Sequence, residues 1–169
     1  MTGEKTLEII EVLKPGDVIL RGFRHYLDGK FVPSKSGWSH GAVFVGNNQI
    51  IHAVAKGVSK IDVVDFTRCD RIAILRPKKG QRKAIACAKR FLKNKTPYDF
   101  GFERDVSSLY CFELCGECYR SLKIEGKTIR KMFGLIKKDN VFLAESFFDS
   151  PDFDCVFQYN PLCDVDFRK

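Results

Sequence analysis

The sequence lacks the features that mark a secreted or membrane-spanning protein. Its first residues carry no basic segment followed by an apolar run and a small-residue cleavage site. No later stretch approaches the ~18 uninterrupted apolar residues of a membrane-spanning helix. We therefore expect a soluble protein of the cytoplasm.

The cysteines and histidines of the chain limit which disulfide, metal and catalytic sites are possible. The seven cysteines are an odd number and accompany no secretion signal, so we expect free thiols rather than a disulfide framework. A second Cys-x-x-Cys pair, which a structural zinc site usually adds to the first, is absent. Only three histidines are available as a catalytic base: His25, His40 and His52.

What is present fits one ordinary globular domain. The chain has 169 residues, of which 44% are hydrophobic and 30% charged, a composition far from that of a disordered protein. This length is enough for one hydrophobic core and short for two. We predict a single domain over residues 1–169, without internal repeats.

The hydrophobic pattern predicts an α+β fold, with an antiparallel sheet of about five strands packed against helices. Tight turns such as Gly46-Asn47-Asn48 join neighbouring β-forming runs, which cover residues 18–20, 42–45, 49–54, 58–64 and 71–76. Helical periodicity predicts helices over 7–13 and 80–94 and another near Cys111, with Ser107 or Ser108 as its cap. We also expect a long loop at 21–38, a helix near 139–148 and a strand near 153–159.

The net charge of +8 is accompanied by a basic cluster on the predicted helix at 80–94 and its flanks. One interpretation is a solvated helix face, and the other is a docking surface for an anionic partner such as a lipid head group. We do not expect nucleic acid as a partner, because neither the aromatic pattern of RNA-binding strands nor zinc-finger spacing accompanies the charges. The cluster consists of Lys78, Lys79, Arg82, Lys83, Lys89, Arg90, Lys93 and Lys95.

Cys111 is the candidate nucleophile because it lies in the first turn of a predicted helix. Unpaired backbone N–H groups and the positive end of the helix dipole stabilise an anion there, so we expect a lowered thiol pKa. The same N–H groups can form part of an oxyanion hole. The alternative is that Cys111 is a small hydrophobic residue of the core.

His40 and His52 are the candidate partners of that thiol. If residues 40–45 and 49–54 form a hairpin, the numbers of facing residues sum to about 94, and His40 faces residue 54. His40 and His52 then meet diagonally on one face of the sheet. Such a pair suits a general base and a second imidazole that fixes its tautomer.

Several short motifs resemble those of a known family, in the same order. The chain is similar to the circularly permuted papain-like hydrolases, in the YiiX-like branch of the NlpC-type superfamily, which is related to lecithin:retinol acyltransferase. The resemblance spans residues 14–120 and leaves 121–169 uncovered. The motifs are Lys14-Pro15-Gly16-Asp17-Val18-Ile19-Leu20, Trp38-Ser39-His40-Gly41-Ala42-Val43-Phe44-Val45, Ile50-Ile51-His52-Ala53, Pro97-Tyr98-Asp99 and Tyr110-Cys111-Phe112-Glu113-Leu114.

The resemblance implies a permuted papain-like fold and a cysteine hydrolase. Cys111 matches the nucleophile, His40 the general base, and His52 the third residue, which orients His40. Such enzymes cleave amide, peptide or ester bonds, or transfer an acyl group, through an acyl-thioester and without a metal or other cofactor. The expected substrate is a small molecule, a lipid or a peptide.

Two alternatives belong to other classes of protein. A metal site could use Cys111, Cys115 and Cys118 with a histidine, whereas we expect Cys115 and Cys118 to be core residues. A non-catalytic module could keep the fold and bind an anionic lipid or polymer through the basic helix, peripherally at a membrane. The remaining expectations are core positions for Cys69, Cys87 and Cys155, and a turn-capping role for Asp17.

Overall fold

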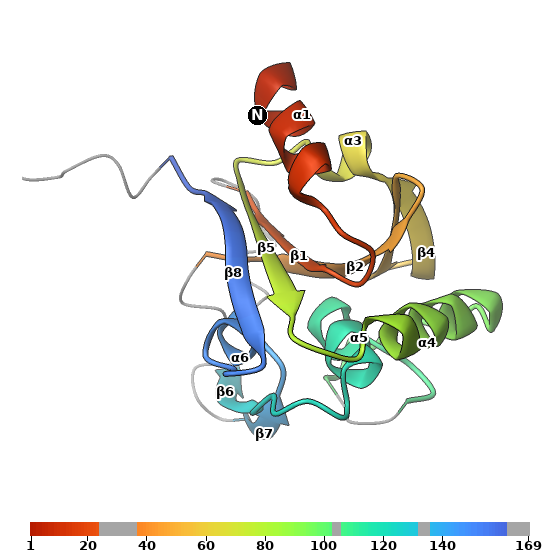
Figure 1. The fold of residues 1–169 in the computed structure, drawn as a ribbon. Helices are drawn as coiled ribbons and strands as arrows, with labels where there is room; N and C mark the ends of the chain where they lie inside the picture. The colour runs from red at the N-terminus through yellow and green to blue at the C-terminus, as the bar shows by residue number, and fades with distance from the viewer. Residues whose placement is uncertain (24–36, 103–105, 132–135, 162–169) are drawn as a thin grey trace, which may run out of the picture.

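The computed structural model describes residues 1–23, 37–102, 106–131 and 136–161. Most of the chain is built around a six-stranded antiparallel sheet (Figure 1). The sheet order is β4-β3-β2-β1-β5-β8. The α+β prediction is therefore confirmed, and the predicted C-terminal strand joins the sheet as its sixth member. The strands are β1 (Val18–Gly22), β2 (His40–Gly46), β3 (Gln49–Val54), β4 (Gly57–Asp62), β5 (Arg71–Pro77) and β8 (Phe153–Tyr159).

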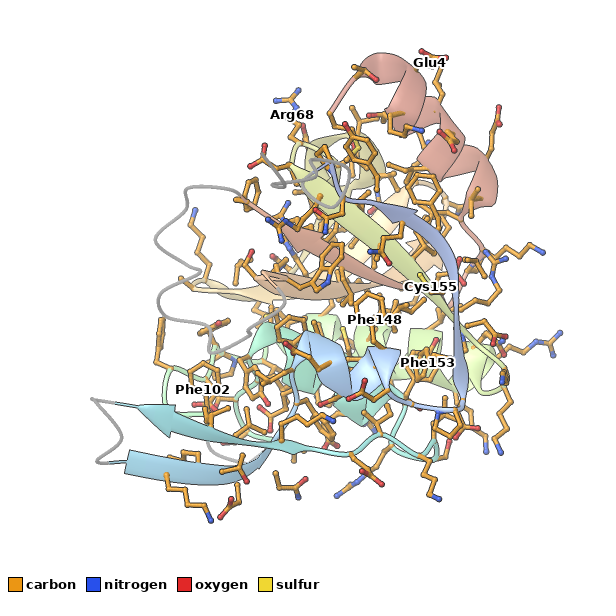
Figure 2. The ribbon with its side chains drawn as sticks, turned by 90° about the vertical axis from the view of Figure 1, so that its left-hand side faces the viewer. Glu4, Arg68, Phe102, Phe148, Phe153 and Cys155 are labelled. Carbon is orange, nitrogen blue, oxygen red and sulfur yellow. The ribbon has the colours of Figure 1, made fainter. Side chains whose placement is uncertain are left out.

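Helices cover both faces of this sheet. In Figure 1, α1 (Gly3–Val12) and α3 (Val63–Phe66) lie on one face, and α4 (Gln81–Lys93) and α5 (Cys111–Cys118) lie on the other. A short helix, α6 (Ala144–Phe148), leads into β8, next to a small sheet of β6 (Lys127–Lys131) and β7 (Ile136–Val141). In the turned view of Figure 2, Glu4 and Arg68 lie on the α1 side, and Phe102 and Phe148 on the opposite side. No helix among the described residues is long and apolar enough to cross a membrane.

The sheet separates two hydrophobic cores, because successive side chains of a strand point to opposite faces. Val18 and Leu20 of β1 pack with Phe112 and the other buried residues of α4 and α5. Ile19, between them, packs with Phe66 of α3 and the buried side of α1. The fold therefore presses the first turn of α5 against the middle of the sheet.

The basic cluster lies on the solvent side of α4. Ala84, Ala88 and Phe91 form the buried stripe of this helix, as its periodicity predicts. Every residue of the basic cluster is exposed. The helix therefore presents a solvated, positively charged face.

Asp17 does more than cap a turn. Its carboxylate accepts a hydrogen bond from the Lys14 N–H at 2.8 Å, which closes the predicted turn. It also forms two hydrogen bonds with the Arg76 guanidinium, at 2.9 Å from Nε and 2.8 Å from Nη2. Arg76 Nη2 in turn donates to the Val12 carbonyl oxygen at 2.6 Å, so this buried ion pair joins α1, β1 and β5.

Some predicted boundaries are wrong for local reasons. The first helix starts at Gly3 rather than Leu7, because the Thr2 hydroxyl accepts a hydrogen bond from the Lys5 N–H at 3.3 Å. The strand predicted at 58–64 ends at Asp62, whose carboxylate caps α3 by accepting from the Val64 N–H at 2.8 Å.

Three further predictions differ from the structure or fall outside it. The cap of α5 is Tyr110, not Ser107 or Ser108. The helix expected at 139–148 is two elements, since β7 continues to Val141 and α6 starts at Ala144. Most of the predicted loop at 21–38, including His25, lies outside the described residues.

Candidate active site

The two strand histidines meet as the hairpin pattern predicts. Ala42 pairs with His52 across β2 and β3, which confirms the predicted register. His40 lies two residues before Ala42 and therefore on the same face as His52. Its Nε2 is 3.0 Å from Nδ1 of His52, and the two rings are nearly perpendicular, at 77°. One shared proton therefore joins the imidazoles.

Phe66 and Arg21 surround this histidine pair. The Phe66 ring lies 5.8 Å from the His40 ring and 6.1 Å from the His52 ring, measured between centroids. Arg21 of β1 pairs with His40 across the sheet, and its guanidinium lies 4.4 Å from the Phe66 centroid. Arg21 also donates a hydrogen bond from Nη1 to the Phe66 carbonyl oxygen at 3.2 Å. The imidazoles thus face an apolar ring and a fixed positive charge.

This environment keeps both imidazoles neutral. Burial, followed by the charge of Arg21 and the neighbouring His52, holds the pKa of His40 well below its usual 6.5. Burial and Arg21 lower the pKa of His52 to about 4. Near neutral pH a neutral imidazole has one nitrogen with a lone pair, so His40 can accept a proton.

The tautomer of the pair decides which nitrogen is available. If His40 donates its Nε2 proton to Nδ1 of His52, then Nδ1 of His40 carries the free lone pair. In the other tautomer His52 donates, and Nδ1 of His40 is occupied by hydrogen. Only the first arrangement leaves His40 Nδ1 able to act as a base.

Cys111 is the first residue of α5 and so lies in the first turn, as predicted, with the sulfur at the helix N-terminus. Backbone N–H groups of Gly41, Phe112 and Cys111 itself hydrogen-bond to the sulfur, and each favours the thiolate. Burial is the larger effect, because Cys111 is only 3% exposed, and it raises the thiol pKa to about 11. The expected lowering of the pKa is therefore wrong, and the thiol is neutral.

Gly41 lies between the cysteine helix and the histidine pair: its Cα faces Phe112 of α5, whereas the rings of His40 and His52 lie against Phe66 of α3. The β2–β3 pairing ends at Ala42 and His52, so the N–H of Gly41 lies beyond the ladder and points to the sulfur of Cys111. That nitrogen belongs to the peptide bond between His40 and Gly41, so the sulfur lies beside the backbone of His40. A side chain at Gly41 would come within 2.8 Å of the Phe112 ring, which explains why glycine occupies this position.

Three other residues of the predicted motifs, Tyr110, Asp99 and Glu113, are also buried. Tyr110 accepts a hydrogen bond from the Phe142 N–H at 2.8 Å through its hydroxyl, which anchors the segment before Cys111. Asp99 accepts from the Gly101 N–H at 2.7 Å through Oδ1. Its Oδ2 is buried and has no hydrogen-bond partner among the described residues. Glu113 is 1% exposed in the first turn of α5.

Sequence reasoning missed Arg21, which it assigned to a loop. The structure extends β1 to Gly22 and places Arg21 opposite His40. The pairing of β1 with β2 joins strands separated by a long connection, and no local signal in the sequence gives its register. The only available signal was a charged residue directly after an apolar strand.

The remaining cysteines occupy different environments. Within the described residues no three His, Cys, Asp or Glu side chains are grouped so that they could hold a metal ion. Cys69, Cys115 and Cys118 are buried, in agreement with the predicted core positions, and Cys87 is partly buried. Cys155 is exposed on the edge strand β8, so its predicted core position is wrong.

Comparison with known proteins gives one family. The family model described as permuted papain-like amidase enzyme, YaeF/YiiX, C92 family, matches residues 12–157. The matched region contains Cys111, His40 and His52 and continues through most of β8, beyond the motifs that carried the resemblance. No curated protein matches the chain.

Proposed function

The chain belongs to this family of permuted papain-like amidases, which makes it a thiol hydrolase, and we propose that Cys111 and His40 are its nucleophile and general base. The substrate class implied by the family is a small molecule or a peptide with a scissile amide bond. The observation that carries the residue assignment is the hydrogen-bonded His40–His52 pair, together with the position of Cys111 at the start of α5.

The reaction begins with transfer of the thiol proton. His52 accepts the Nε2 proton of His40 in a hydrogen bond and so leaves His40 Nδ1 free to take the proton from Cys111. The sulfur attacks the substrate carbonyl carbon, and N–H groups at the start of α5 stabilise the oxyanion. The His40 imidazolium then gives its proton to the leaving amine, the C–N bond breaks and an acyl-thioester remains.

Water completes the cycle. His40 removes a proton from the water as its oxygen attacks the thioester carbonyl, and the sulfur leaves and regains a proton. If an acceptor alcohol or amine takes the place of water, the same steps transfer the acyl group. Hydrolysis is the reaction we propose, since the family consists of amidases.

The pKa values determine the timing of the first step. Burial raises the pKa of Cys111 to about 11 and holds that of His40 well below its usual 6.5, so a standing thiolate–imidazolium pair is unfavourable. We therefore propose that His40 removes the proton while the sulfur attacks the carbonyl carbon. Arg21 disfavours the imidazolium electrostatically, and this makes His40 a stronger acid toward the leaving amine.

Labelling with a peptidyl chloromethylketone tests the residue assignment. Intact-protein mass spectrometry should show one adduct, mapped to Cys111, in the wild type and in the Cys155→Ser variant. Cys155→Ser is the matched control because it removes an exposed thiol on the edge strand β8. His40→Ala should slow the labelling by ~10²-fold or more, the usual contribution of a general base. Slow labelling of several cysteines at equal rates in wild type and His40→Ala would overturn the assignment.

A lipid substrate at a membrane surface is a second candidate, supported by the basic cluster. All residues of the cluster are exposed, no acidic residue occurs between residues 77 and 98, and Phe100 just beyond them is 70% exposed. Each Lys or Arg near an anionic bilayer contributes roughly 1 kcal/mol to binding. Wild type should co-sediment with phosphatidylserine vesicles, and a Lys79→Glu/Lys83→Glu/Lys93→Glu variant should not. Equal sedimentation of both proteins would rule out docking through this face.

A further inference from the structure

Two thiols that the proposed amidase reaction does not use interact across the contact between α4 and α5. Cys87 lies in the middle of α4 and is partly exposed, and Cys118 is the last residue of α5. The Cys87 thiol contacts the backbone of Glu117, the residue before Cys118, so the two cysteines lie where α4 meets the end of α5. Cys118 lies seven residues after Cys111 on the same helix, which corresponds to about 10 Å along the axis. The pair is therefore separate from the proposed nucleophile.

The surroundings of Cys87 favour its thiolate. The Arg90 guanidinium, one turn later on α4, donates a hydrogen bond from Nη2 to the Cys87 sulfur at 3.6 Å. When it is protonated, the Cys87 thiol donates a hydrogen bond to the Glu117 carbonyl oxygen at 3.9 Å, which holds the sulfur at the α5 side of the helix. A cation, a partner thiol and partial solvent access are the features of an oxidation-sensitive cysteine.

We propose that Cys87 and Cys118 form a peroxide-oxidisable dithiol, in which Cys87 attacks the peroxide and Cys118 resolves the product as a disulfide. This is a modification site distinct from the amidase site, and the small-molecule partner is a hydroperoxide. The disulfide ties α4 to the end of the helix that carries Cys111.

The protonation states support this division of roles. The hydrogen bond from Cys118 is the main cause that lowers the pKa of Cys87 to about 7; the Arg90 charge adds to it, while burial and the nearby Glu117 charge oppose it. The same hydrogen bond and burial hold the pKa of Cys118 well above its usual range. Burial raises the thiol pKa of Cys111 to about 11 and also raises that of Cys155. Cys87 therefore has the largest thiolate fraction among these four cysteines near neutral pH.

The reaction balances without a further reagent. The Cys87 thiolate attacks one oxygen of hydrogen peroxide, the O–O bond breaks, and the departing hydroxide takes a proton to become water. The Cys87 sulfenic acid is then attacked by the Cys118 sulfur, the S–O bond breaks and the hydroxyl leaves as water with the Cys118 proton. Two thiols and one peroxide give one disulfide and two waters.

Treatment of the full chain with hydrogen peroxide at a roughly stoichiometric dose tests the proposal. Non-reducing intact-mass analysis should show a loss of ~2 Da, and peptide mapping should link Cys87 to Cys118. Cys155→Ser, the exposed-thiol control, should give the same link. Cys118→Ser should stop at a Cys87 sulfenic acid, which a cyclic 1,3-dione traps. Cys87→Ser should react with hydrogen peroxide at least about tenfold more slowly than the wild type.

Two outcomes would overturn the proposal. One is oxidation of Cys155 at the same rate as Cys87, and the other is a disulfide that forms only between two chains. The Cys111→Ser variant should keep the Cys87–Cys118 link, so failure of the proposed amidase chemistry would leave this result unaffected. A thermal melt of each variant verifies that the serine substitutions leave the protein folded.

Discussion

The close approach of Gly41 to Phe112 predicts a defect that couples packing to reactivity. In Gly41→Ala the new Cβ would lie 2.8 Å from the nearest carbon of the Phe112 ring, about 0.6 Å less than the shortest ordinary contact. A Leu20 methyl carbon lies 3.4 Å from the new Cβ, so residue 41 cannot move toward β1 to avoid the Phe112 ring. The first turn of α5 therefore has to move away from β2, and Cys111 moves with it.

The expected size of the defect follows from two general effects. One extra methyl group in a packed core costs about 1–3 kcal/mol of the free energy of unfolding. A reacting group misplaced by close to 1 Å can lose up to ~10²-fold in rate. Gly41→Ala should therefore lower stability moderately in a urea titration and slow chloromethylketone labelling of Cys111 by a larger factor.

Matched variants separate this explanation from general destabilisation. Gly3→Ala is the control, because no atom lies within 4 Å of the added Cβ. It should label like the wild type. The double variant Gly41→Ala/Phe112→Leu removes the clashing ring atoms and should recover part of the labelling rate lost in the single variant. Labelling of Gly41→Ala at the wild-type rate would refute the reasoning.

Three further predictions concern charge. Arg76→Met leaves the Asp17 carboxylate, which is 1% exposed, without its counter-ion, and should lower the free energy of unfolding by about 3 kcal/mol in a urea titration. This is the lower end for a broken buried pair, because the Arg76 side chain is 25% exposed. Lys78→Met breaks an exposed pair and should cost at most ~1 kcal/mol, so equal losses in the two variants would contradict this account. The pKa of His52 is lowered from 6.5 to about 4 in the folded protein, so between these pH values the unfolded chain binds a proton that the folded protein does not. Neutral His52 therefore contributes its full stabilisation above pH 6.5, and the free energy of unfolding decreases as the pH falls from 6.5 to about 4. The loss should be smaller in His52→Gln, and equal pH dependence of both proteins would exclude His52 as its source. Arg21→Met removes a charge that lowers the pKa of His52, so the value measured by NMR titration should rise, and an unchanged value would show that burial alone sets it.

Local signals were sufficient for much of the sheet and for the histidine pair. The short turn after Gly46 fixes the alignment of β2 and β3. The contact between His40 and His52 therefore followed from how many residues separate each histidine from that turn. The presence of a helix near Cys111 followed from helical periodicity in the same way, although its cap was expected at Ser107 or Ser108. Where a tight turn or a regular period determines a feature, the sequence contains the required information.

Features that depend on distant packing could not be predicted in this way. The pKa of Cys111 depends on how deeply the sheet and α5 bury the sulfur, and burial outweighs the helix terminus. The position of Arg21 beside His40 depends on the register of β1 with β2. Cys155 is exposed because β8 is an edge strand, which its apolar sequence does not reveal.

The acyl-enzyme is the most direct test of the central claim, that Cys111 attacks a carbonyl with His40 as its base. Wild-type protein mixed with p-nitrophenyl acetate, quenched in acid within seconds and mapped by mass spectrometry, should carry one acetyl group on the Cys111 sulfur. The adduct should be absent in Cys111→Ser and reduced by ~10²-fold in His40→Ala. An acetyl group spread over lysines, or an adduct of equal yield in all three proteins, would contradict the assignment.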